Sequence, residues 1–173
     1  MSVLDRLLPS EKGRILINDI SWETFNDFHW RENVSTVINP IQLFQGTVLE
    51  NIGRGIIPFE PDKIISFCKE MGLDRFFDNF VNGFTSIIDV DGISSGQKQL
   101  VALVSALYRS PNILLLDEPF AFMDDELSEF CWNILQKLKT EMVIIIFLSN
   151  KKLIFKADGV LFLNNGEFQV KGE

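Results

Sequence analysis

Apolar residues follow two different spacings along this chain, and together they predict alternating strands and helices. Unbroken apolar runs at Ile113–Leu116 and Val143–Ile146 are typical of short strands that are covered on both faces. The segment between residues 100 and 108 instead repeats at helical spacing, with apolar side chains at Leu100, Leu103, Val104, Leu107 and Tyr108. We therefore expect an α/β fold.

The remaining pattern predicts further elements of both kinds. We expect a strand at 34–38, helices within 60–80 that separate near Gly72, a helix at 125–139, strands at 141–148 and 159–163, and a hairpin from 159–163 to 167–170 through Asn164, Asn165 and Gly166. Val3–Leu8 resembles the end of a helix. No internal repeat or low-complexity tract interrupts this pattern, which indicates one domain or part of one.

The predicted helix near residue 100 begins with small polar residues. Ser94 and Ser95 are good N-cap residues, and Gly96 lets a ligand approach the backbone closely. Free backbone N–H groups and the positive end of the helix dipole make such an N-terminus a favourable site for a phosphate. An ordinary helix cap is the simpler interpretation of this segment taken alone.

The apolar strand 113–116 ends in two carboxylates, Asp117 and Glu118. Placing two acids at the end of a buried strand is costly unless a cation or a reacting water uses them. A solvated strand end is again the alternative for this segment alone. Found together and in this order, the two segments favour a site for a phosphate and a cation over two unrelated structural features.

Charge and composition narrow the possible functions. The 24 acidic and 16 basic residues give a net charge of −8, which argues against a nucleic-acid-binding surface. Cys68 and Cys131 lie far apart and are typical of buried thiols in a reducing compartment, and His29 is the single histidine. No apolar run reaches the roughly 18 residues of a membrane-spanning helix, and the start lacks a signal-peptide pattern. We expect a cytoplasmic protein.

The motifs resemble those of the nucleotide-binding domain of ABC-type exporters over essentially the whole chain. The segment 92–100 is similar to the signature motif and 113–119 to the Walker B motif, and further similar segments lie at 9–17, 43–52, 80–84 and 157–166. The resemblance implies a P-loop NTPase-like ABC ATPase core, with an inserted helical subdomain at about 44–96 and the core at 1–43 and 97–173.

Three departures from the family pattern stand out. The chain contains no G-x-x-x-x-G-K-[ST] sequence, so it resembles a domain that lacks its first strands and Walker A P-loop. The Q-loop glutamine position holds Asn39, which is one methylene shorter. The switch-histidine position holds Leu148 or, with a one-residue slip, Ser149, and Ser95 replaces a signature glycine.

By resemblance, Asp117 holds Mg²⁺ through water, Glu118 polarises the attacking water as general base, and Asp124 occupies the D-loop position. Ser94, Ser95, Gly96 and Gln97 form the signature segment, which contacts ATP held on the P-loop of a second nucleotide-binding domain. ATP and Mg²⁺ are therefore expected only with such a partner, in a homodimer or a heterodimer. Transmembrane domains of an exporter are the other implied partners, and they place the chain at the inner face of a membrane.

Catalysis of phosphoryl transfer depends on positioning and charge stabilisation, much of it from the P-loop. We therefore expect no ATP turnover from this chain alone. Two interpretations remain open beside a truncated exporter ATPase domain: a degenerate regulatory or structural subunit, and a gene remnant or fragment. The resemblance also implies that a P-loop strand lies beside the strands 113–117 and 143–148. We expect that its absence leaves apolar edges that favour self-association.

Overall fold

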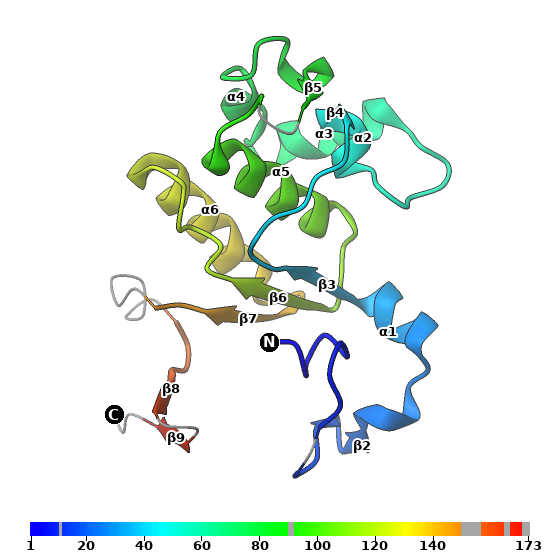
Figure 1. The fold of residues 1–173 in the computed structure, drawn as a ribbon, viewed down its shortest axis with the longest axis vertical. Coiled ribbons are helices and arrows are strands. Elements are labelled where there is room, and N and C mark those ends of the chain that lie inside the picture. Colours follow the sequence, from blue (N-terminus) through cyan, green and yellow to red (C-terminus); the bar gives the residue numbers. More distant parts are fainter. Residues whose placement is uncertain (11, 90–91, 150–156, 165–166, 171–173) are drawn as a thin grey trace.

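A computed structural model describes the chain except for residues 11, 90–91, 150–156, 165–166 and 171–173. The predicted α/β fold is confirmed, because helices cover a small parallel sheet (Figure 1). In chain order, the sheet strands are β3 (Val34–Val37), β6 (Ile113–Asp117) and β7 (Val143–Phe147). The two long helices are α5 (Ser95–Tyr108) and α6 (Asp125–Leu138).

The central sheet has the order β3-β6-β7, with all strands parallel. Val34 is opposite Ile113, and Ile113 is opposite Val143, so β6 is paired along both of its edges. This corrects one expectation. The expected P-loop strand cannot lie beside 113–117, because β3 and β7 already occupy both edges of β6. Within the described residues, only the outer edges of β3 and β7 are open to a further strand.

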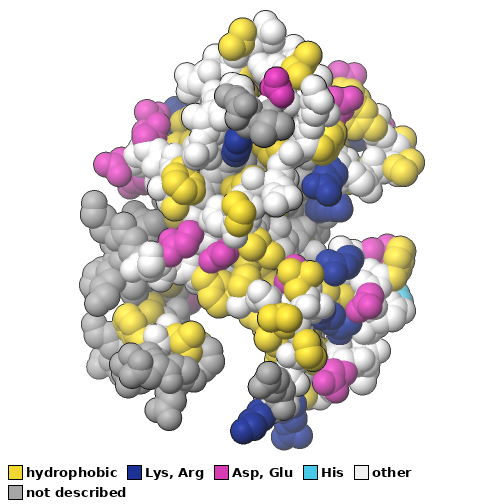
Figure 2. All heavy atoms as spheres, in the orientation of Figure 1, with side chains coloured by type: hydrophobic (Ala, Val, Ile, Leu, Met, Phe, Trp, Pro, Cys, Tyr) yellow, Lys and Arg dark blue, Asp and Glu magenta, His cyan; other side chains and the backbone are white. Residues whose placement is uncertain are grey.

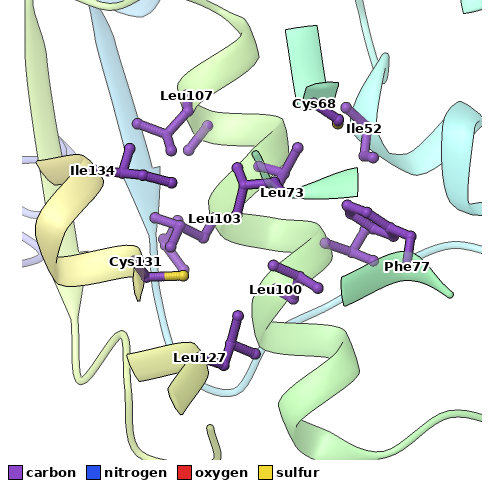
Figure 3. Packing of buried hydrophobic residues seen from close by; sticks show 14 of the residues in the cluster. Ile52, Cys68, Leu73, Phe77, Leu100, Leu103, Leu107, Leu127, Cys131 and Ile134 are labelled. Atoms are coloured by element: carbon purple, nitrogen blue, oxygen red, sulfur yellow. The ribbon is translucent and has the colours of Figure 1, made fainter. Parts of the chain in front are cut away.

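Helix α5 lies at the centre of the hydrophobic core. Figure 3 shows Leu100, Leu103 and Leu107 of α5 between two groups of apolar side chains. On one side lie Leu127, Cys131 and Ile134 of α6, and on the other lie Ile52, Cys68, Leu73 and Phe77. Burial of α5 on both sides explains why its apolar positions are so closely spaced.

The elements between residues 46 and 88 gather at one end of the molecule (Figure 1). They are β4 (Gly46–Thr47), α2 (Val48–Ile52), α3 (Pro61–Glu70), α4 (Asp74–Phe77), the 3₁₀ turn η2 (Gly83–Thr85) and β5 (Ile87–Ile88). Gly72 separates α3 from α4 with a positive φ of 68°, as the sequence predicts. The helical subdomain at 44–96 stays a prediction.

The N-terminal part is less regular than expected. Residues 2–8 form turns instead of the end of a helix. They are followed by β1 (Leu16–Ile17), β2 (Ile20–Ser21), the 3₁₀ turn η1 (Trp22–Thr24) and α1 (Asp27–Asn33). The guanidinium of Arg6 lies over the rings of Trp22 and Trp30, at 5.2 and 4.5 Å from their centroids, and also donates to the Phe25 carbonyl.

The C-terminal part contains an antiparallel pair, β8 (Leu161–Asn164) and β9 (Glu167–Val170). The predicted hairpin is therefore present, while the turn residues Asn165 and Gly166 lie outside the described residues. Among the described helices, none combines the length and the apolar character needed to cross a bilayer.

Candidate nucleotide site

The candidate site begins where strand β6 ends. Leu114, Leu115 and Leu116 are fully buried, and the strand then delivers Asp117 and Glu118 to a half-buried position at its carboxyl end. In a parallel sheet this end is where ligand sites of α/β proteins form. The structure thus places both predicted acids at one edge of the sheet.

Glu118 has an unusual backbone conformation. Its φ is +45°, a region that residues other than glycine seldom occupy and that occurs often at functional sites. Its N–H donates to the carbonyl of Phe147 at the end of β7, at 2.9 Å. Its carboxylate accepts a hydrogen bond from the N–H of Ser149. The turn after β6 is therefore fixed to the neighbouring strand.

Asn39 reaches the same place from β3. Its Nδ2 donates to the carbonyl of Asp117 at 2.7 Å and approaches that of Glu118 at 3.5 Å. The structure therefore brings together the residue at the Q-loop position and the acidic pair. Ser149, which follows β7, lies in the same group of residues, because its N–H donates to the Glu118 carboxylate. It is one of the two candidates for the switch position.

The signature segment forms the first turn of α5. Ser94 is the N-cap: its hydroxyl accepts from the N–H of Gln97 at 3.2 Å, and the Gln97 side chain accepts from the N–H of Ser94 at 2.9 Å. This capping box confirms the simpler interpretation of the segment as a helix cap. The cap uses the N–H groups of Ser94 and Gln97, so those of Ser95 and Gly96, at the positive end of the dipole of this 14-residue helix, are the first-turn donors that a phosphate could reach. The phosphate site stays a prediction.

The residues of the signature segment differ in solvent exposure and in the hydrogen bonds that they already make. Ser94 and Ser95 are exposed, whereas Gly96 and Gln97 are half-buried. The Nε2 of Gln97 donates to the carbonyl of Asn79, at 3.1 Å. An incoming phosphate would therefore meet the backbone N–H groups and the serine hydroxyls first, and Gln97 would have to leave its internal partners to contribute.

Asp124 lies at the start of α6. Its carboxylate accepts from the N–H of Leu127 at 2.8 Å, so it is the N-cap of that helix. The side chain is exposed, and Phe122 two residues earlier exposes 59% of its surface. Capping thus gives Asp124 a structural role, and its D-loop role stays a prediction.

Sequence reasoning missed Gln99. It is fully buried in the second turn of α5, where its Nε2 donates to the carbonyl of Glu118 at 2.7 Å and its Oε1 accepts from the N–H of Phe122 at 2.9 Å. A signal was available: Gln99 precedes the buried Leu103 by four residues, so it shares the apolar face of the helix.

The residues present fit part of a magnesium–nucleotide site. Among the described residues, no group of three or more His, Cys, Asp or Glu side chains could hold a metal by itself. Mg²⁺ in nucleotide sites is commonly held by one or two carboxylates together with phosphate oxygens, which suits the single pair of Asp117 and Glu118. The 173 residues contain no P-loop sequence to hold those phosphates.

Comparisons with known proteins agree with this geometry. The family model described as "ABC transporter" matches residues 1–121. The chain is 30% identical to the multidrug resistance protein pgp-1 of Caenorhabditis elegans, covering 100% of this chain and 13% of that protein. It is 27% identical to an ATP-dependent lipid A-core flippase of Haemophilus influenzae, covering 99% of this chain and 30% of the flippase.

A solved structure shows the same fold. An ATP-bound bacterial ABC exporter of the Atm1 family matches with a TM-score of 0.86 and 23% identity, over 96% of this chain and 30% of the exporter chain. The chain thus spans less than a third of these proteins. The match to the family model over residues 1–121 shows that the chain belongs to the ABC transporter family, and the fold shows that it corresponds to the nucleotide-binding region.

Proposed function

We propose that this chain supplies the signature segment and the acidic strand end of an ATP-driven exporter, and that ATP and Mg²⁺ bind when a second nucleotide-binding domain contributes a P-loop. The observation that carries the proposal is the direct connection between α5 and the turn at Glu118, which holds the candidate phosphate site and the acids in one unit. Ser94, Ser95, Gly96 and Gln97 would contact the phosphates on the partner's P-loop.

Each remaining residue has a proposed role. At the other nucleotide position of the pair, Asp117 would hold Mg²⁺ through water and Glu118 would orient and deprotonate the attacking water. Asn39 would fix the backbone that carries both acids. Bound Mg²⁺ would supply charge stabilisation to the phosphates. Asp124, besides capping α6, would lie at the contact with the second domain.

A complementation experiment tests this proposal. A complete exporter nucleotide-binding domain is inactivated by replacing its own signature serine with arginine, and this chain is then added. We expect no ATPase activity from either protein alone and measurable activity from the mixture, which the Ser94→Arg variant of this chain should lower at least about 100-fold. Glu118→Gln should leave that activity unchanged, because Glu118 faces the other nucleotide position, for which this sequence has no P-loop.

Two results would count against it. Tight ATP binding to the isolated chain, measured by calorimetry, would show a complete site within these 173 residues. Activity of the mixture that is indifferent to Ser94→Arg would show that the signature segment takes no part. Ser2→Arg, in the N-terminal turn, is a control for the added charge.

One observation favours the alternative of a non-catalytic regulatory subunit. The carboxylate of Glu118 already accepts the N–H of Ser149, and no histidine follows residue 29. A mixture that associates in an ATP-dependent manner without hydrolysing ATP would support this role over the catalytic one.

We propose that the transmembrane part of the exporter docks in the cavity between β3, the loop after it, and α5. This cavity has a volume of about 510 Å³, and its lining includes Arg31, Arg54 and Arg109 but a single carboxylate, that of Asp5. Asp5 accepts from Thr36 at 2.7 Å, and among the described residues none of the three arginines forms an ion pair. Figure 2 shows basic side chains on the right of the molecule, between the α2–α3 end and α1.

This cavity contains none of the candidate nucleotide residues, so docking there would leave the site free. We expect Arg54→Glu to weaken association with detergent-solubilised transmembrane domains at least about tenfold, because it places a carboxylate among the guanidinium groups. Arg14→Glu, exposed and outside the cavity, serves as the matched control. Equal association of both variants, measured by biolayer interferometry, would refute this docking surface.

A further inference from the structure

Gln99 makes two hydrogen bonds to the loop that follows β6. Its Nε2 donates to the carbonyl of Glu118 at 2.7 Å, and its Oε1 accepts from the N–H of Phe122 at 2.9 Å. The side chain has no exposed surface. A buried carboxamide is costly unless both of its ends are paired, so these bonds hold the backbone of the loop firmly against α5.

Gly96 meets the same loop one helical turn earlier. A Cβ atom at this position would lie 2.5 Å from the carbonyl oxygen of Phe122. Because residues three apart share one face of a helix, Gly96 and Gln99 contact the loop side by side. The first two turns of α5 therefore fix the loop at two points, one through close packing and one through hydrogen bonds.

The far end of this loop is the Glu118 turn. The N–H of Glu118 donates to Phe147, its carbonyl accepts from Gln99, and its carboxylate accepts from the N–H of Ser149. With φ at +45°, the residue occupies a conformation that depends on such surrounding contacts. The same carbonyl also accepts from the N–H of Ala121 at 3.2 Å and from Asn39 at 3.5 Å, so the bond from Gln99 is the shortest of three. Loss of Gln99 therefore loosens the peptide and allows the carboxylate to move away from Ser149.

We infer that Gln99 is a positioning residue: it fixes the carboxylate of Glu118 and links that carboxylate mechanically to the signature turn. The link has a functional meaning that rests on the proposed function. In a paired arrangement the signature turn serves one nucleotide and Glu118 serves the other, so Gln99 joins the two sites within this chain. A phosphate that displaces the signature turn would thereby move Glu118.

The link can be tested on the isolated chain by NMR, without nucleotide. Among the described residues no hydrogen bond joins Ser149 to Gln99, and the Ser149 amide proton reports whether the Glu118 carboxylate accepts from it. We expect Gln99→Met to move the Ser149 amide resonance to the position found in Glu118→Ala, and to speed hydrogen exchange at the Phe122 amide about tenfold or more.

Two further variants separate the hydrogen bonds of Gln99 from the close packing at Gly96. Gln99→Glu keeps an acceptor for Phe122 but loses the donor to Glu118, so we expect Phe122 to stay protected while the Ser149 resonance moves. Gly96→Ala leaves both hydrogen-bonding groups in place but displaces the loop sterically, so it should move the Ser149 resonance as well. These variants decide the outcome if Gln99→Met does not fold.

Ser105→Ala is the matched control. Ser105 is another polar residue of α5, and its hydroxyl donates to the backbone carbonyl of Ile52 at 2.9 Å, away from the Glu118 loop. It should leave the resonances of Phe122 and Ser149 unchanged. A Ser149 resonance that stays in place in the Gln99 variants, or equally faster exchange at all amides, would overturn the inference. Since no nucleotide is used, failure of the complementation experiment would leave this result standing.

Discussion

The two thiols show how burial sets the chemistry of single residues in this chain. Cys68 in α3 and Cys131 in α6 face α5 from opposite sides, and each exposes 1% or less of its surface. Burial disfavours the charged thiolate, and it raises the pKa of both thiols from 9.0 to about 12. Neither thiol should act as a nucleophile or a metal ligand while the chain is folded.

A pH dependence of stability follows from these pKa values. In the unfolded chain the thiols ionise near pH 9, while in the folded chain they stay protonated to about pH 12. Their contribution to the free energy of unfolding is therefore complete below pH 9 and is lost between pH 9 and 12. We expect the urea midpoint to fall less between pH 8 and 10 in the variant Cys68→Ala/Cys131→Ala than in the unmodified chain. An identical fall in both would contradict this assignment.

Single residues of the site were predictable to different degrees. Asp117 and Glu118 could be predicted because two acids after an apolar run are rarely compatible with burial. The contacts of Gln99 and Ser149 could not, because each is made to a part of Glu118, which is distant in sequence: Gln99 bonds its carbonyl and Ser149 its carboxylate. Nothing in the local pattern specifies such a partner.

At the level of elements, helix caps carry much of the local information. The start of α5 was predictable from Ser94, and the start of α6 is fixed by Asp124 in the same manner. The segment Val3–Leu8 was wrongly expected to be helical. Its apolar residues suit a helix, but the backbone turns at Arg6, which has a φ of +56° and directs its guanidinium to Trp22 and Trp30. A tertiary contact therefore overrides the local preference.

Capping also gives a prediction that separates the two roles of Asp124. We expect Asp124→Ala to lower the free energy of unfolding by about 1 kcal/mol, because the N–H of Leu127 loses its acceptor. Asp124→Ser should restore most of that stability, measured by urea unfolding, since serine is an equally good cap. If Asp124→Ser is stable but fails to support activity in the complementation mixture, the carboxylate also acts at the contact between domains. Equal stability of Asp124→Ala would rule out the cap.

For the whole molecule, the arrangement of the sheet matters more than any one element. The apolar runs predicted β6 and β7, but their pairing in register, with β3 on the other side of β6, depends on contacts between residues about 30 to 80 positions apart. Sequence patterns carry little of that information. The sheet that results has three strands, and its outer strand β7 pairs only with β6 in the described part of the chain.

Strand β7 leaves apolar surface at this edge. Val143 exposes 58% of its surface, and Ile144, Ile145 and Ile146 are only half-buried, although parallel strands are usually covered on both faces. Figure 2 shows hydrophobic side chains gathered near the middle of the displayed face, at the level of the sheet. An apolar strand with an unpaired edge favours pairing with another chain.

We therefore expect the isolated 173-residue chain to self-associate, with an apparent mass in light scattering that rises with protein concentration. Val143→Lys should reduce this association, because a charge at an exposed edge position opposes strand pairing between molecules. Ile57→Lys is the matched control: Ile57 exposes 93% of its surface but lies in the loop between α2 and α3, away from the sheet. A concentration-independent monomer with sharp cooperative unfolding would show that the β7 edge is satisfied within the chain, and equal effects of the two lysines would show that association is not specific to that edge.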